Sequence, residues 1–172
     1  MKFFKLASKV FDGLIEVCTW FVGIYLLFAM LSVSAGVLLR YFFDKPLGWT
    51  TEISYYSLIP LALLAAPRLL RDGGHIIVDL IMQFISADAK RIVSIITCFF
   101  SAALLLVISV YGFIITREMY VTNYLTDTFL MMPKWPLVGI STLGIFMTAI
   151  QFVRNAIKWI KDEEVAQGST EE

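Results

Sequence analysis

Two sites in this sequence place ionisable side chains where they could take part in chemistry. Glu16 lies near the start of the first long apolar run, and a carboxylate inside such a run can carry protons across a membrane. His75 and Asp79 are four residues apart, so on a helix they share one face, where Gln83 continues the polar stripe. The simplest interpretation of all these residues is solvation at a membrane surface. Contact with a partner protein is the functional alternative for His75 and Asp79.

A third group of charges interrupts the apolar sequence in the stretch GVLLRYFFDKPLGWTTEIS, which runs from Gly36 to Ser54. Arg40 ends one apolar run and Glu52 begins the next, so each charge complements the dipole of its own helix end. A short connection brings these ends together, which makes an ion pair between Arg40 and Glu52 geometrically reasonable. Trp49 is typical of an anchor at headgroup depth. The pattern alone indicates a well-formed turn and no particular function.

The residues that most kinds of catalysis need are missing from the sequence. Its single histidine cannot provide paired axial ligation of a haem. No GxxxxGK[ST] phosphate loop, HExxH zinc motif or plausible Ser/His/Asp set occurs. Cys18 and Cys98 each lie in an apolar run, without the spacing of a disulfide framework or of paired metal ligands. We therefore predict no catalytic residue, no cofactor site and no metal site, and the protein is not expected to be an enzyme.

The composition is that of a membrane protein. Hydrophobic residues make up 59% of the 172 residues and charged residues only 16%, with a mean hydropathy of +0.79. The formal net charge is zero, which gives no indication of a nucleic-acid partner. The basic N-terminus precedes an apolar run that is too long for a signal peptide, and we interpret that run as a retained first span.

Four segments are long and apolar enough to cross a bilayer as helices. Their apolar cores predict spans at about residues 14–39, 50–70, 92–115 and 136–158. The prediction is thus an all-α integral membrane protein of four helices, forming one domain over residues 1–161. A disordered cytoplasmic tail is expected at residues 162–172, where hydrophobic periodicity is lacking.

The distribution of basic residues predicts that both termini are cytoplasmic, because short cytoplasmic loops carry the excess of Lys and Arg. In that orientation ten of the 14 basic residues lie on the inner side: Lys2, Lys5, Lys9, Arg68, Arg71, Lys90, Arg91, Arg154, Lys158 and Lys161. A short interfacial helix carrying His75 and Asp79 is expected between spans two and three, because its apolar run is too short to cross. The outer loop Thr116–Trp135 is polar and aromatic, and Trp135 is placed where aromatic belts usually lie.

Small residues recur at helix-packing spacing inside the spans, and such pairs let helix backbones approach closely. The pairs are Ser32 with Gly36, Ala62 with Ala66, and Gly144 with Thr148. We give most weight to packing of the four helices on one another and the remainder to docking against a larger partner.

The order of several short motifs resembles one family, the small membrane subunit of tripartite ATP-independent periplasmic (TRAP) transporters, which is DctQ-like. The motifs are Arg40-Tyr41-Phe42, Pro46-Leu47, Trp49, Glu52-Ile53, His75-Ile76, Val78-Asp79 and Pro133-Lys134-Trp135. The resemblance covers about residues 15–155, including the number of spans, the orientation and the loop lengths.

The resemblance implies a function that the residues alone do not. It implies a location in the bacterial inner membrane and association with a large multi-span permease subunit. A periplasmic binding protein would deliver an organic acid, and a sodium gradient would drive its uptake. The sialic acid branch is suspected over the C4-dicarboxylate branch. The residues expected to serve the structure or the subunit interface are Arg40, Trp49, Glu52, His75, Asp79 and Trp135.

A subunit without ionisable residues at membrane depth suits a stationary scaffold better than a solute pathway. Our hypothesis is that the chain braces the static part of the permease. Its outer surface, Arg40–Glu52 and Thr116–Trp135, would form part of the landing site for the binding protein. The main alternative is a self-sufficient small proton-coupled multidrug antiporter that acts as a homodimer through Glu16. A structural four-span protein with another partner also remains open, and a membrane enzyme is a weaker alternative.

Overall fold

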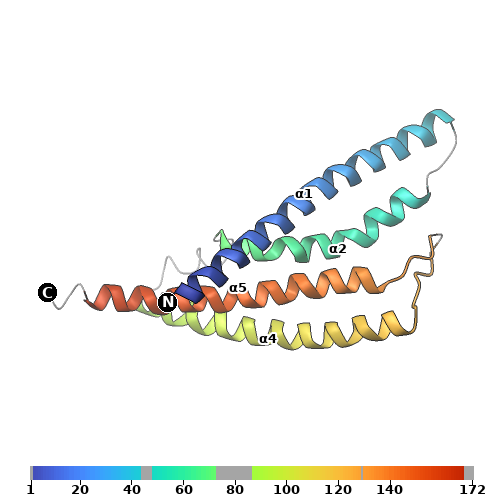
Figure 1. Cartoon of the computed structure of the whole chain (residues 1–172). Coiled ribbons are helices and arrows are strands. Elements are labelled where there is room, and N and C mark those ends of the chain that lie inside the picture. The colour runs from blue at the N-terminus through green and yellow to red at the C-terminus, as the bar shows by residue number, and fades with distance from the viewer. Residues whose placement is uncertain (1, 44–47, 73–86, 129, 169–172) are drawn as a thin grey trace.

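The computed structural model describes residues 2–43, 48–72, 87–128 and 130–168, and these residues form four long helices (Figure 1). The helices are α1 (Lys2–Phe43), α2 (Gly48–Arg71), α4 (Ala87–Val121) and α5 (Trp135–Gly168). Each contains a stretch that is long and apolar enough to cross a membrane. The predicted all-α class with four spans is therefore confirmed. Residues 73–86, with the expected interfacial helix, His75 and Asp79, lie outside the described residues.

The helices extend beyond the predicted spans. α1 begins at Lys2 and has 42 residues, about 63 Å at 1.5 Å per residue, whereas the hydrocarbon core of a bilayer is about 30 Å thick. α5 continues past residue 161 to Gly168, through a segment rich in Lys, Glu, Ala and Gln, which favour helices. Hydropathy marks only the apolar part of a helix, so it could not locate these polar extensions.

The four helices form a row of two antiparallel hairpins rather than a bundle around a central core. α1 packs on α2, α2 on α5, and α5 on α4, which gives the spatial order α1, α2, α5, α4 (Figure 1). Both chain termini lie at one end of the row, which we call the termini end. The opposite end carries the connection from α4 to α5, residues 122–134, and we call it the loop end.

Close contacts at glycine hold the row together. A Cβ atom added to Gly144 of α5 would lie 2.5 Å from the carbonyl carbon and oxygen of Leu63 in α2, so only glycine fits there. A Cβ atom on Gly112 of α4 would lie 2.6 Å from Oγ1 of Thr142 in α5. A Cβ on Gly36 of α1 would lie 3.0 Å from Oγ1 of Thr50 in α2. Each neighbouring pair of helices therefore has a point where a missing side chain permits close approach.

These contacts show which of the predicted small residues pack between helices of this chain and which do not. Gly36 and Gly144 pack between helices of this chain, as expected. Ala62 is exposed, so it does not contribute to helix packing within the chain.

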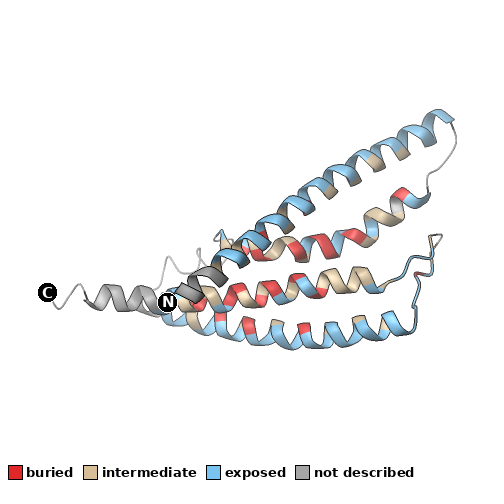
Figure 2. Ribbon diagram, viewed as in Figure 1, coloured by how far each residue is buried: buried red, intermediate tan, exposed pale blue. Residues whose placement is uncertain are grey.

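The buried residues gather on the two central helices, α2 and α5, as Figure 2 shows. One cluster joins α2, α4 and α5 near the termini end and consists of Leu70, Cys98, Ala102, Phe152 and Ala156. A second cluster joins α1 and α2 through Val22, Leu61 and Leu64. Most apolar side chains of α1 and α4 remain exposed. A single row of helices has two broad apolar faces, which lipid or another protein must cover.

Candidate functional site

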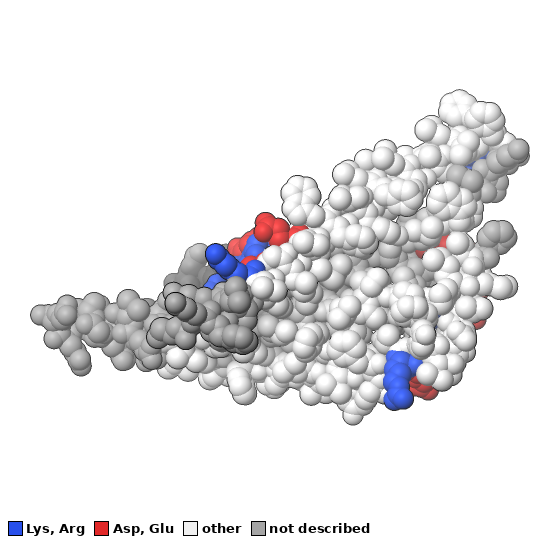
Figure 3. All heavy atoms as spheres, viewed as in Figure 1, with Lys and Arg blue, Asp and Glu red and all other residues white. Residues whose placement is uncertain are grey.

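Ionisable side chains from three helices meet at the termini end. The group comprises Asp12 and Glu16 of α1, Arg68 and Arg71 of α2, Asp72 directly after α2, and Arg154 of α5, and we call it the ionic cluster. Figure 3 shows these charges beside a wide white surface. With three arginines and three carboxylates, the cluster has balanced formal charge.

Arg154 joins α5 to α1 through a bidentate hydrogen bond. Its Nη1 donates to Oδ1 of Asp12 at 2.8 Å, and its Nη2 donates to Oδ2 at 2.9 Å. Nη2 also donates to the Ser8 hydroxyl at 2.6 Å, and the guanidinium lies 5.2 Å from the centre of the Phe11 ring. The planar guanidinium matches the carboxylate geometry, which makes this a strong and directional contact.

Two amide side chains, of which Gln151 is buried, extend this contact from α5 to α2. Gln151 is fully buried, accepts a hydrogen bond from Arg154 at 3.2 Å and donates one to Asn155 at 3.1 Å. Asn155 donates to the carbonyl oxygen of Leu70 at 3.3 Å, in the last turn of α2, where helix carbonyls lack partners of their own. From the sequence, Arg154 indicated only the orientation of the chain. Gln151 lies three residues before Arg154 and Asn155 directly follows it. This run of polar residues in an apolar helix was the sequence feature that could have indicated the network.

Arg68 holds the α2 side of the cluster. Its Nε donates to Oδ2 of Asp72 at 2.8 Å, and its Nη1 lies 3.6 Å from Oε1 of Glu16. The hydrogen bond from Arg68 lowers the pKa of the Asp72 carboxyl below its ordinary value, so Asp72 is charged at neutral pH. Arg71 contacts Asp72 at 3.4 Å and Asp12 at 3.9 Å. Glu16 therefore belongs to an ion pair at the termini end of the molecule.

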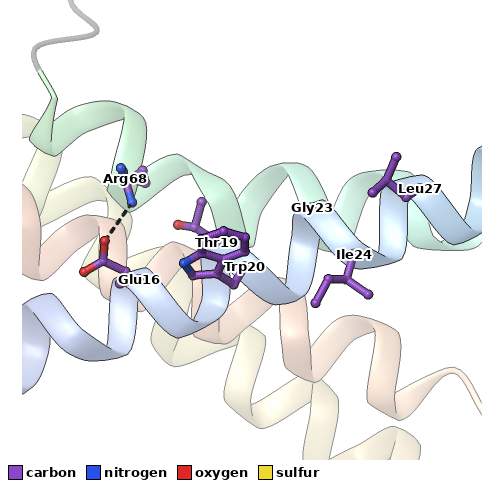
Figure 4. A pocket seen from close by; sticks show the side chains of 7 residues that line it. All are labelled: Glu16, Thr19, Trp20, Gly23, Ile24, Leu27 and Arg68. Carbon is purple, nitrogen blue, oxygen red and sulfur yellow. Dashed lines mark ion pairs between the residues drawn. The ribbon is translucent and has the colours of Figure 1, made fainter.

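An apolar groove begins at this ion pair and follows one face of α1, as Figure 4 shows. Its volume is about 470 Å³, and we call it the α1 groove. The lining residues are Glu16, Thr19, Trp20, Gly23, Ile24, Leu27 and Arg68. Only Arg68 comes from α2, so the groove is essentially a hollowed face of the first helix.

A second cavity, of about 370 Å³, lies between the two hairpins toward the loop end. Its lining residues include Tyr56 and Pro60 of α2, Ile108 of α4, Lys134 directly before α5, and Ile145 of α5. The lining is largely apolar, with Lys134 as its only ionisable side chain except for the tyrosine. It offers no set of groups for acid-base or nucleophilic chemistry.

The connection from α4 to α5 is organised by its own hydrogen bonds. The backbone N–H of Thr126 donates to the carbonyl of Met132 at 2.8 Å, and the N–H of Met132 donates to the Thr126 hydroxyl at 2.9 Å. Lys134 contacts Asp127 at 3.4 Å and lies 4.5 Å from the centre of the Tyr124 ring. These contacts give the loop end a defined surface.

The structure places the predicted residues of the loop end in different environments. The N–H of Leu130 donates to Oε2 of Glu52 at 3.1 Å, so Glu52 ties the α1–α2 hairpin to the α4–α5 connection. Trp135 stacks edge-to-face on Tyr120, with ring centres 5.3 Å apart. Trp49 is partly exposed, at 39%.

Among the described ion pairs, none joins Arg40 to Glu52, a pairing that the sequence made geometrically reasonable. Arg40 lies exposed in the last turn of α1, whereas Glu52 is directed to a backbone N–H of the other hairpin. The donor that contacts Glu52 lies 78 residues away, so the sequence around Glu52 does not reveal it.

Metal chemistry has no candidate site in the described residues, since no group of three or more His, Cys, Asp or Glu side chains is positioned to hold an ion. Cys18 and Cys98 are free thiols.

Comparison with known proteins gave one result. A family model described as "Tripartite ATP-independent periplasmic transporters, DctQ component" matches residues 29–162. The match runs from within α1 to the polar end of α5. Asp12, Glu16 and the α1 side of the groove precede it. No curated protein and no solved structure matches the chain.

Proposed function

Because the chain belongs to the DctQ component family of tripartite ATP-independent periplasmic transporters, we propose that it is the scaffold subunit of a sodium-driven organic acid transporter. In this role it supports a large multi-span permease subunit in the bacterial inner membrane. A periplasmic binding protein supplies the substrate. We propose sialic acid, rather than a C4-dicarboxylate, as that substrate.

The observation that carries this proposal is the placement of charge along the helices. The sequence has no Asp, Glu, Lys, Arg or His between residues 17 and 39, 53 and 67, 92 and 116, or 136 and 153. The described ion pairs lie at the two ends of the row. A pathway for a charged carboxylic acid needs counter-charges or broken helix ends at membrane depth. This chain therefore acts beside the pathway, and its row of helices widens the static part of the permease.

The same placement argues against the proton-coupled antiporter. Glu16 forms an ion pair with Arg68 at the termini end, and its side chain is 56% exposed. A carboxylate that carries protons through a homodimer would have to reach the middle of the membrane.

We also propose an orientation in which the termini end is cytoplasmic and the loop end is periplasmic. The excess of basic residues at the termini end supports this orientation. The loop end then faces the binding protein, and its hydrogen-bonded connection is suited to forming part of a landing site. Arg40, Trp49, Glu52 and Trp135 belong to that surface. His75 and Asp79 are proposed to contribute to partner contact on the cytoplasmic side.

The test is complementation of substrate uptake in cells that lack this subunit. Wild type, Arg40→Ala, Glu52→Ala and the double variant are compared for membrane insertion, co-purification of the large subunit and uptake. We expect the variants to insert normally and to show reduced uptake or assembly. Full uptake by the double variant would contradict the landing-site role. Purification of the wild type as a homodimer without a large subunit would contradict the scaffold role.

A further inference from the structure

The α1 groove has features that the scaffold role does not by itself explain. Its lining residues extend from Glu16 to Leu27, which is about 16 Å along the helix axis and three helical turns. Within this length the groove is largely apolar, and its charged groups are the ion pair at its termini end (Figure 4). A groove of this length that ends in a charged pair is suited to contact with another helix.

The backbone of α1 is open along this groove. A Cβ atom added to Gly23 would meet no atom within 4 Å, whereas one added to Gly36 of the same helix would meet Thr50 of α2. Thr19 lies one turn before Gly23 on the same face, so two small residues stand next to each other. Small residues at this spacing allow helices to approach closely in a membrane. The contact that Gly23 would permit is not made within the described part of the chain.

The carboxylate of Glu16 is a second, independent indication that a partner binds at this groove. Among the described residues its ion-pair partner is Arg68 at 3.6 Å, but Arg68 lies much closer to Asp72, at 2.8 Å. Glu16 thus retains acceptor capacity beside an apolar surface, where a second donor would be strongly favoured. Trp20, one turn along the helix, is 70% exposed, and tryptophan and arginine are the residues enriched in binding hot spots.

We propose that the α1 groove binds a transmembrane helix of the large permease subunit, and that a basic residue at the cytoplasmic end of that helix pairs with Glu16. This inference rests on the proposed function and names the surface through which it operates. A helix fills the groove over three turns, approaches the backbone at Gly23 and brings a cation to the carboxylate. A lipid acyl chain would fill the groove without using the open backbone at Gly23.

The steric test compares Gly23→Leu with Ala103→Leu as a matched control. Gly23 has free space around it, so leucine fits the chain itself and obstructs only an incoming helix. Ala103 is exposed near the middle of α4, away from the groove. The tagged chain is co-expressed with the large subunit, purified in mild detergent, and the ratio of the two subunits is measured. We expect Gly23→Leu to lower this ratio about tenfold and Ala103→Leu to leave it unchanged.

The charge test uses Glu16→Gln and Glu16→Lys in the same assay. Loss of the carboxylate charge should weaken co-purification, and reversal to a cation should weaken it further, because two cations would then face each other. Rescue of Glu16→Lys by an acidic substitution at one basic residue of the large subunit would identify the pairing residue. Equal co-purification of wild type and Glu16→Lys would overturn the charge pairing.

Photo-crosslinking identifies what occupies the groove. A photoreactive phenylalanine derivative at Ile24, in the groove, is compared with one at Phe99 on α4, since both positions are exposed. The proposal expects an adduct with the large subunit from position 24 and not from position 99. An adduct with lipid alone, or with a second copy of this chain, would overturn it.

The outcomes separate this inference from the proposed function. If the wild type brings down the large subunit but Gly23→Leu does so equally well, the groove is not the contact and the scaffold role stands. If the wild type brings down no large subunit, the scaffold role itself fails.

Discussion

The guanidinium of Arg154 joins α5 to α1, because it binds both carboxylate oxygens of Asp12 and the hydroxyl of Ser8. Its side chain is 18% exposed and that of Asp12 is 35% exposed, so water screens the pair only in part. A membrane gives two apolar helices little reason to prefer one another over lipid. A directional polar contact therefore determines where α1 lies against α5.

Replacement of Arg154 by lysine should destabilise the protein although the charge is kept. An ammonium group cannot bind both oxygens of Asp12 in the fork geometry, so we expect a loss of about 1–2 kcal/mol in the free energy of unfolding. Thermal unfolding of the purified protein in detergent measures the change. Asp127→Asn is the control, since Asp127 pairs with Lys134 at the surface and is 89% exposed, and its loss should cost less than about 1 kcal/mol. Equal effects would mean that the Arg154 contact is no stronger than a surface ion pair.

At the scale of the helices, the decisive contact is that between α2 and α5, which joins the two hairpins. Gly144 lies directly against the backbone at Leu63, so the helices touch there without intervening side chains. Pro60 and Pro67 lie inside α2, and Figure 1 shows that this helix is not straight. The hairpins are joined again at the loop end, where Glu52 accepts a hydrogen bond from Leu130. Between these two points the helices leave the cavity that Lys134 borders.

The same substitution at two glycines should have opposite effects on stability. Gly144→Ala places a methyl group 2.5 Å from the backbone of α2, so the hairpins must separate, at a cost of about 1–3 kcal/mol. Gly23→Ala meets no atom of the chain and should stabilise α1 by up to about 1 kcal/mol through helix propensity. Thermal unfolding of both purified variants, compared with wild type, distinguishes these outcomes. Stabilisation by both variants would show that the two hairpins are not in close contact at Gly144.

At the scale of the whole molecule, the row of helices has little interior of its own. The buried residues form small clusters along α2 and α5, whereas α1 and α4 expose most of their apolar side chains (Figure 2). A closed bundle would have hidden these side chains from the surroundings. A row gives the chain a large contact area for its size, which suits the proposed role of widening a permease.

The orientation of this row can be tested by labelling single cysteines in intact cells. In a background with Cys18→Ala and Cys98→Ala, a membrane-impermeant maleimide should label Asp127→Cys at once. Lys158→Cys should be labelled only after the membrane is permeabilised, because the basic termini end is expected to be cytoplasmic. Both positions are exposed, so access of the reagent depends on the side of the membrane. Immediate labelling at position 158 with none at 127 would reverse the orientation.

The sequence by itself determined the all-α class and the number of helices long and apolar enough to span a membrane, since hydropathy over about 20 residues is a local property of the chain. It also carried the family resemblance, which the match over residues 29–162 confirmed. Only the tertiary structure decided which helices are neighbours and which polar groups meet. Asp12 and Arg154 are 142 residues apart, and neither residue's surroundings in the sequence indicate the other. For the same reason the sequence did not reveal that Glu52 accepts a hydrogen bond from Leu130. The partner of a charged group depends on the packing of helices, which apolar periodicity does not specify.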